Sequence, residues 1–379
     1  MSIVTKRIAA ISPSLTLAIT AKAKAMKAEG KSVIGFGAGE PDFNTPQHII
    51  DAAKDALDKG YTKYTPSSGL PALRAKIAEK LKAEQGLDYD MSQIVVSSGA
   101  KHSIFNAMFA LVEEGDEVII PAPYWLTYPE VVKVCGGKSV FVEGHKENHF
   151  KISPEDLKKA ITPKTKVLVF NSPSNPTGAV YTEEEIRAIG KVVEEAGIWV
   201  ISDEIYSKLI YDGVKHFSIA RVSEKVKEHT VVVDGVSKTY AMTGWRIGWL
   251  AAPKEVAKAI DSFQSHATSN PTSISQYATL AALSGSEEEL NKMRDIFNDR
   301  RKFMIERIHK IEGLGCIEPD GAFYIMLIVD KLYGKRYNGR KINGSMDVAD
   351  MLLEKGVAVV PGIAFGDDEC VRLSYAISK

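Results

Sequence analysis

The sequence is poor in the features that would mark a secreted, nucleic-acid-binding or membrane protein. It has three cysteines, none in a Cys-x-x-Cys pair, which excludes a disulfide framework and favours a reducing compartment. It has no excess charge, with 48 basic and 48 acidic residues, so a strongly basic face for nucleic acid is not expected. No run reaches the roughly 18 apolar residues of a membrane span. We therefore expect a cytoplasmic protein with neither nucleic-acid nor membrane partners.

The N-terminal segment lacks acidic residues before Glu29, while it carries several lysines and one arginine. This composition is shared by transit peptides. It also fits a folded helix that begins at Leu15 and stops at Gly30, a residue typical of helix C-termini. We favour the helix because its pattern runs directly into the next motif.

Helical and strand-like segments alternate along most of the chain. Short apolar runs such as QIVVSS, DEVIIPAP, TKVLVFNSP, GIWVISDE and HTVVVDGVS are separated by helical or turn-rich segments, which predicts an α/β fold with a mostly parallel sheet covered on both faces. In the segment PQHIIDAAKDALDKG, a buried helical face is predicted to contain Ile49, Ala53, Ala56 and Leu57. We predict three regions: an N-terminal arm that belongs partly to a small domain (1–45), a large domain (46–285) and a small α+β C-terminal domain (286–379).

Polar side chains follow several of these strands. In open α/β sheets, ligands bind beyond the carboxyl ends of the strands. Lys238 follows an apolar strand, where partial desolvation would lower its pKa and make its amine a nucleophile. Asp203 and Tyr206 follow another strand, and a carboxylate buried there needs a cationic partner. The turn at Gly99 leads into a helix N-terminus that suits a phosphate.

Each signal has a plainer explanation by itself: an exposed lysine, a helix cap or an ordinary turn. Together they match what pyridoxal phosphate needs. Its aldehyde requires an amine, its ring nitrogen an acid, its phenolic oxygen hydrogen-bond donors, and its phosphate N–H groups and cations.

The chain resembles class I aminotransferases of the aspartate aminotransferase family, which have the fold of type I pyridoxal-phosphate enzymes. The resemblance rests on seven motifs in order: GEPDF (39–43), YTPSSGLPALR (64–74), PYWLTYPE (123–130), NSPSNPTG (171–178), SDEIY (202–206), SKTYAMTGWRIG (237–248) and VRLSYA (371–376). It implies a large domain with a seven-stranded sheet and a smaller α+β domain.

The resemblance also implies roles for individual residues. Lys238 would hold pyridoxal phosphate covalently and shuttle the proton, and Asp203 would pair with the ring nitrogen. The other cofactor contacts implied are Tyr206 and Asn175 at the phenolic oxygen, Trp125 on the ring face, and Gly99, Ala100, Lys101, Ser237 and Arg246 around the phosphate. Tyr64 would reach the phosphate of a neighbouring subunit, which implies a homodimer with shared active sites.

The implied substrates are an amino acid and a 2-oxo acid. Arg372 would bind the α-carboxylate and Gly39 would approach the substrate closely. Thr16 and Lys101 match a bacterial-type subgroup in which a lysine after this turn holds a second carboxylate, so aspartate or glutamate is the expected donor. Prephenate, aromatic or broader donors remain open, as do a lyase and a non-catalytic cofactor-sensing domain.

Two other motifs are discounted. GFGAGE at 35–40 lacks the third glycine and the following helix of a dinucleotide fingerprint. HKENH at 145–149 lies in a predicted loop, so its histidines do not share a helix face for a metal.

Overall fold

The computed structural model describes residues 3–378. Its centre is a seven-stranded sheet. The pairs formed by β3, β4, β5, β6 and β7 are parallel, whereas β8 pairs antiparallel with both of its neighbours, β2 and β7. The strand order is β2 (Ile94–Ser97), β8 (Gly248–Ala251), β7 (Thr230–Gly235), β6 (Trp199–Asp203), β5 (Thr165–Asn171), β3 (Glu117–Ala122) and β4 (Lys138–Glu143). The mostly parallel α/β sheet predicted from the sequence is confirmed.

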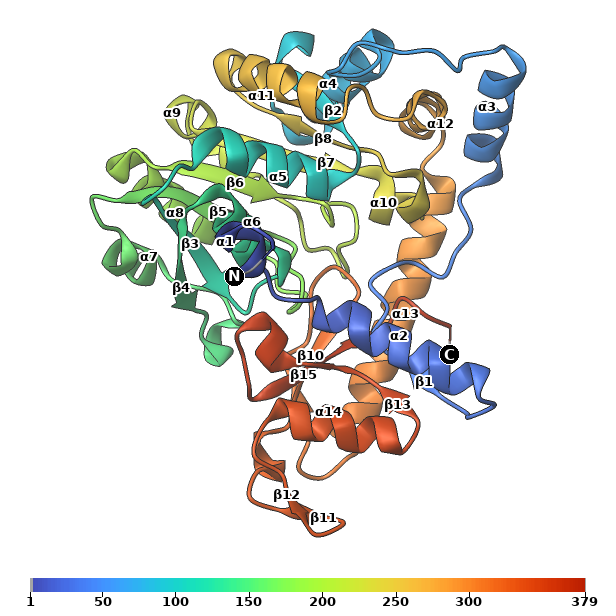
Figure 1. Cartoon of the computed structure of the whole chain (residues 1–379), viewed down its shortest axis with the longest axis vertical. Helices are drawn as coiled ribbons and strands as arrows, with labels where there is room; N and C mark the ends of the chain where they lie inside the picture. Colours follow the sequence, from blue (N-terminus) through green and yellow to red (C-terminus); the bar gives the residue numbers. More distant parts are fainter. Residues whose placement is uncertain (1–2, 379) are drawn as a thin grey trace.

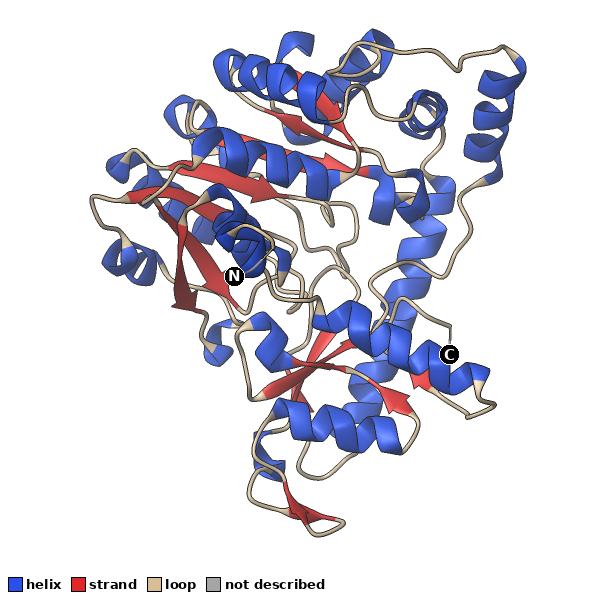
Figure 2. Cartoon of the chain, viewed as in Figure 1, coloured by secondary structure: helices blue, strands red, loops and turns tan. Residues whose placement is uncertain are grey.

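Helices cover both faces of this sheet (Figures 1 and 2). The helices of this part of the chain are α3 (Gln47–Asp58), α4 (Pro71–Gln85), α5 (Ala100–Leu111), α6 (Thr127–Cys135), α7 (Pro154–Ala160), α8 (Glu183–Ala196), α9 (Glu224–Lys227), α10 (Val236–Thr239), α11 (Lys254–Ala267) and α12 (Ser273–Ser284). Of these, α3 lies to the side of the sheet and packs against α12 (Figure 1). Alternate residues of one strand enter different cores: Val167 and Val169 join one cluster, Leu168 and Phe170 another. This two-sided burial explains the continuous apolar runs in the sequence.

The chain's last quarter builds a second, smaller layer. The long helix α13 (Glu288–His309) leads to an antiparallel sheet of order β14 (Val360–Pro361), β15 (Cys370–Ser374), β10 (Tyr324–Ile328) and β9 (Gly315–Cys316). Helix α14 (Ser345–Glu354) packs on this sheet, and the short hairpin of β11 (Arg336–Tyr337) and β12 (Arg340–Lys341) projects from it (Figure 1).

The N-terminal segment folds against this smaller layer. The short helix α1 (Lys6–Ala9) contacts α6, and α2 (Leu15–Ala28) contacts β13 (Val357–Ala358) and β14. Strand β1 (Ile34–Gly35) pairs in parallel with β13. The helix predicted from Leu15 is confirmed, and Gly30 has a φ of 80°, the left-handed conformation expected after a helix end. The three domain boundaries themselves stay a prediction.

One core prediction is wrong. Leu57, assigned to the buried face of α3, is 51% exposed, whereas Ile49, Ala53 and Ala56 are buried. Leu57 directly follows Ala56, so it points about 100° away around the helix and away from the partner surface.

Candidate active site

A cavity of about 470 Å³ lies beyond the carboxyl ends of β5 and β6, between the large sheet and the smaller layer. Its walls come from parts of the chain that are distant in sequence: α2, the segment after β1, the starts of α5 and α6, the ends of the central strands, the segment after α10, and β10 with β15. The predicted site residues that line it are Thr16, Gly39, Ala100, Lys101, Trp125, Asn175, Asp203, Tyr206, Ser237, Lys238, Arg246 and Arg372.

Lys238 lies in the short helix α10, directly after β7. Its Nζ donates a hydrogen bond of 2.6 Å to the carbonyl oxygen of Gly39. The pKa of this amine is lowered to about 8, chiefly by burial, with the nearby cations Arg246, Arg372 and Lys101 contributing and Glu40 opposing the shift. A substantial fraction of the amine is therefore neutral near physiological pH, as a nucleophile or proton acceptor must be.

Asp203 ends β6 and is 3% exposed. Its carboxylate accepts hydrogen bonds from the Tyr128 hydroxyl (2.7 Å) and from the backbone N–H of Ile205 (3.3 Å). Burial raises the pKa of Asp203 to about 6 in spite of these donors. No cationic side chain among residues 3–378 forms an ion pair with it, so the carboxylate is suited to a cationic group entering from the cavity.

Arg372, on β15, is buried between the rings of Tyr324 and Phe365, 4.4 and 4.8 Å from its guanidinium carbon. Its Nη1 donates to Asn175 Oδ1 (2.9 Å) and its Nη2 to the Gly37 carbonyl (3.1 Å). Within the described chain its buried Nε has no hydrogen-bond partner. This unsatisfied donor in a cavity wall suits a bound carboxylate.

The turn between β2 and α5 brings an arginine against a helix N-terminus. Gly99 is the N-cap of α5 at φ 91°, and no side chain caps the helix. A Cβ on Gly99 would meet the Arg246 guanidinium, and the φ of 91° is strained for any residue with a side chain, so both features favour glycine at this position. The uncapped N–H groups beside a guanidinium form a cradle with the properties a phosphate needs.

Two predicted site residues, Tyr64 and Gly99, do not line this cavity. The side chain of Tyr64 is 89% exposed. Gly99 stands behind the cavity wall, in contact with Arg246, rather than in the lining itself.

Two aromatic residues of the site were missed from the sequence. Tyr128, on α6, donates to Asp203, and the Tyr324 hydroxyl lies 3.0 Å from that of Tyr206. Tyr128 follows Trp125 by three residues, and their rings meet edge to face at 5.4 Å. That one-turn spacing at the start of a helix was the available signal for Tyr128, but nothing in the sequence around Tyr324 pointed to the cavity.

A buried amine, a buried carboxylate without a cation, an anion cradle and an arginine with a free donor share one cavity. These groups fit pyridoxal phosphate, and together with a match to a family of aminotransferases they place the protein in the class of pyridoxal-phosphate-dependent transaminases. Residues 31–379 match the family described as "Aminotransferase class I and II". The chain belongs to this family.

Characterised relatives are similar over nearly the whole length. The chain is 54% identical to the aspartate aminotransferase of Bacillus subtilis, covering 98% of this chain and 94% of that protein. It is 46% identical to the probable aspartate/prephenate aminotransferase of Rhizobium leguminosarum bv. phaseoli, covering 100% and 96%.

Solved structures agree with the fold. The aspartate aminotransferase of Rhizobium meliloti superposes with a TM-score of 0.97 at 43% identity, covering 100% of this chain and 96% of that chain. The Thermus thermophilus enzyme solved with maleate superposes with a TM-score of 0.94 at 42% identity, with the same coverage. These structures and the seven-stranded sheet confirm fold type I.

No helix within residues 3–378 has both the length and the apolar character needed to cross a membrane. The same residues contain no cluster of three or more histidine, cysteine or acidic side chains placed to bind a metal. His145 of the discounted HKENH motif instead contacts Asp156 at 3.0 Å.

Proposed function

We propose that the chain is an aspartate aminotransferase that transfers the amino group of aspartate or glutamate to a 2-oxo acid such as 2-oxoglutarate. The observation that carries the proposal is the cavity that the amine of Lys238 and the carboxylate of Asp203 share with two cationic side chains, Arg372 and Lys101. The names of the relatives support the same activity. Two half-reactions at one site predict ping-pong kinetics.

Pyridoxal phosphate, when bound, supplies an aldehyde that reacts with amines and a ring that accepts electrons from the substrate's α-carbon. Asp203 would keep the ring nitrogen protonated, and Tyr206 and Asn175 would face the phenolic oxygen. Trp125 would stack on the ring. The phosphate would lie against the N-terminus of α5, with Ser237 and Arg246.

Lys238 moves the proton in this mechanism. With its pKa lowered to about 8, its amine can remove the proton from the substrate's α-carbon and return one to the cofactor side. The Gly39 carbonyl holds Nζ through its 2.6 Å hydrogen bond, which fixes the amine at the cavity wall when it is not reacting.

Two cations bind the two ends of an acidic substrate. Arg372 would hold the α-carboxylate through its fork, including the free Nε. Lys101 lies in the first turn of α5, with Nζ 4.9 Å from the centre of the Trp125 ring, and Thr16 lines the cavity from α2. Burial lowers the pKa of Lys101, with Arg246 adding to the effect. A second carboxylate beside Lys101 would relieve this crowding of cations.

The second candidate substrate is prephenate. Relatives at 45–46% identity over nearly the full length carry the name aspartate/prephenate aminotransferase. Prephenate has two carboxylates, one on its 2-oxo-acid side chain and one on the ring carbon that bears this side chain, so the same two cations suit it.

We further propose a cytoplasmic homodimer in which Tyr64 reaches the phosphate site of the partner. The 89% exposure of Tyr64, together with its absence from the cavity of its own chain, supports this arrangement. Mixing inactive Lys238→Ala and Tyr64→Ala chains should restore activity, because one of the two hybrid sites then has both residues. If the mixed hybrid stays inactive, the sites are not shared.

The activity is tested by borohydride reduction of the protein loaded with pyridoxal phosphate, followed by peptide mapping. The label should fall on the peptide containing Lys238, and Lys238→Ala should lose both the label and turnover. A panel of amino donors with 2-oxoglutarate then ranks aspartate against prephenate-derived, aromatic and branched donors. Product formation without a 2-oxo acid would indicate a lyase, and binding without turnover a sensing domain.

A further inference from the structure

The turn that carries Asp203 and Tyr206 is held from behind by a second buried carboxylate, that of Glu204. Along a strand, successive side chains point to opposite faces. Asp203 therefore faces the cavity, while Ser202 and Glu204 face the side covered by α8. Glu204 is 1% exposed and plays no part in the chemistry proposed above.

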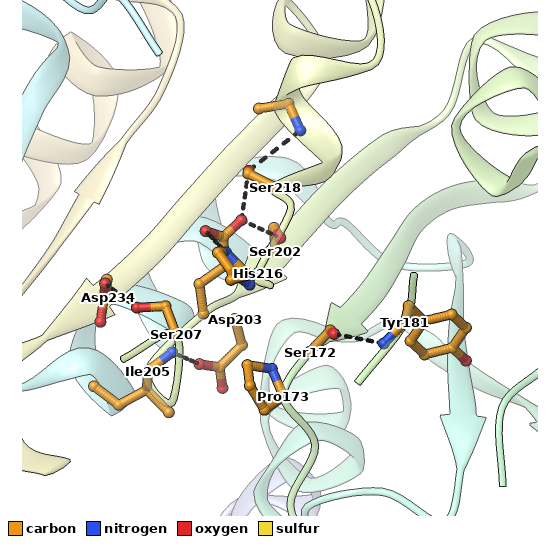
Figure 3. Close-up of polar contacts among 12 residues, drawn as sticks. Ser172, Pro173, Tyr181, Ser202, Asp203, Ile205, Ser207, His216, Ser218 and Asp234 are labelled. Atoms are coloured by element: carbon orange, nitrogen blue, oxygen red, sulfur yellow. Dashed lines mark hydrogen bonds and ion pairs between the residues drawn. The ribbon is translucent and has the colours of Figure 1, made fainter. Parts of the chain in front are cut away.

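The Glu204 carboxylate accepts three hydrogen bonds. The hydroxyls of Ser202 and Ser218 donate to Oε1 at 2.9 and 2.6 Å, and Nε2 of His216 lies 2.8 Å from Oε2. Ser202 and Ser218 are fully buried and the His216 side chain is 10% exposed. Figure 3 shows Ser202, His216 and Ser218 gathered on one side of Asp203, whose own carboxyl contacts Ile205 on the other.

These contacts join two separate segments. Ser202 lies in β6 and Glu204 directly follows that strand, whereas His216 and Ser218 belong to the loop that precedes the 3-10 turn Ile219–Arg221. The backbone N–H of Glu204 also bonds to the Val233 carbonyl on β7, at 2.8 Å. Glu204 is thereby fixed through both its backbone and its side chain.

We propose that Glu204 and His216, with Ser202 and Ser218, form a positioning cluster for the transamination reaction: they fix the turn after β6 so that Asp203 and Tyr206 meet the cofactor in one orientation. His216 also places a partner for negative charge beside Glu204. Without it, an unpaired carboxylate would stand next to Asp203, and the repulsion would favour the protonated form of Asp203. The pKa of Asp203 is in fact raised partly by Glu204.

The inference rests on the proposed function, because positioning has meaning only if Asp203 serves a bound cofactor. Displacing a reacting group by about 1 Å can lower the rate about 100-fold. We therefore expect Glu204→Gln and His216→Leu to lower kcat by roughly 10- to 100-fold with a smaller change in KM. They should also weaken pyridoxal phosphate binding and shift the pH midpoint of its absorbance band when bound.

A matched control variant distinguishes a positioning role of the cluster from a role in stability alone. Ile189 on α8 is fully buried in the same core cluster as Phe217, which lies within the His216–Ser218 segment, and Ile219, which follows it. Ile189→Val should lower the urea midpoint of unfolding without changing cofactor affinity, kcat or the absorbance midpoint. His216→Gln, which restores an N–H donor, should recover part of the lost kcat.

The result that overturns the inference is a Glu204→Gln or His216→Leu protein that, like Ile189→Val, loses only stability. If Glu204→Gln does not fold, Ser202→Ala serves instead, because it removes a single donor to Oε1; unchanged cofactor affinity and kcat in that variant would also overturn the inference. Wild-type protein is measured in the same series. A wild type that neither binds pyridoxal phosphate nor transaminates contradicts the proposed function, whereas an active wild type with unaffected cluster variants contradicts only the positioning role.

Discussion

The hydroxyl of Tyr128 donates a 2.7 Å hydrogen bond to Oδ2 of Asp203, and both side chains are buried. A phenol that donates to a carboxylate stabilises the ionised form, whereas burial favours the protonated one. In Asp203 burial is the larger effect, and its pKa is raised to about 6. Tyr128 therefore keeps Asp203 closer to the charged form that a protonated ring nitrogen requires.

Tyr128→Phe should weaken the ionic contact between Asp203 and the ring nitrogen of the bound cofactor. A hydrogen bond to a charged group contributes about 1.5–3 kcal/mol, so the affinity of the apoprotein for pyridoxal phosphate should fall by roughly tenfold or more. The affinity is measured by titrating the apoprotein with pyridoxal phosphate. Tyr181→Phe is the control, because the Tyr181 hydroxyl is also buried but accepts from the Ile152 N–H at 3.0 Å, away from the cavity. Equal losses in the two variants would remove Tyr128 from the site.

The raised pKa of Asp203 predicts a pH-dependent stability of the apoprotein. Because its pKa of about 6 in the folded protein exceeds the ordinary 3.8, folding is favoured while the group is protonated. That contribution is fully present below about pH 4 and is lost as the pH rises through about 6. Asp203→Asn cannot ionise, so relative to wild type it should gain up to about 3 kcal/mol of unfolding free energy between pH 4 and pH 7. Urea unfolding of both apoproteins at the two pH values measures this, and parallel pH curves would contradict it.

Lys101→Ala should affect acidic donors selectively. Loss of the cation removes a contact with the second carboxylate, so kcat/KM for aspartate and glutamate should fall roughly tenfold or more, and that for alanine or phenylalanine much less. Steady-state rates with these four donors measure the ratio. Lys24 on α2 also lines the cavity, which makes Lys24→Ala a matched control. Equal losses on all four donors would exclude Lys101 from substrate recognition.

Arg372→Lys should lower kcat/KM for every amino-acid donor. The lysine keeps the charge but loses the planar fork that holds a carboxylate with two hydrogen bonds, so kcat/KM should fall about 100-fold for acidic and neutral donors alike. Arg300→Lys is the control, since Arg300 forms its own two-bond contact with Asp42, at 2.8 and 3.1 Å, outside the cavity lining. A loss confined to acidic donors would place Arg372 at the second carboxylate instead.

Much of the fold could be predicted because the sequence repeats one local signal. Strands β5, β6 and β7 are short apolar runs buried on both faces, and each is followed by polar residues at the edge where the cavity lies. Leu57 shows the limit of this reasoning: helical spacing gives the width of an apolar face only approximately, and the packing partner decides where that face ends.

The sequence by itself determined the alternation of strands and helices, the family motifs and the residue types that pyridoxal phosphate requires, because these depend on local spacing and composition. Only the tertiary structure decided which side chains support those residues. Tyr128 lies 75 positions from Asp203, and Tyr324 lies 118 positions from Tyr206. Such contacts arise from how elements far apart in the chain pack together, and no local pattern specifies a hydrogen bond between them.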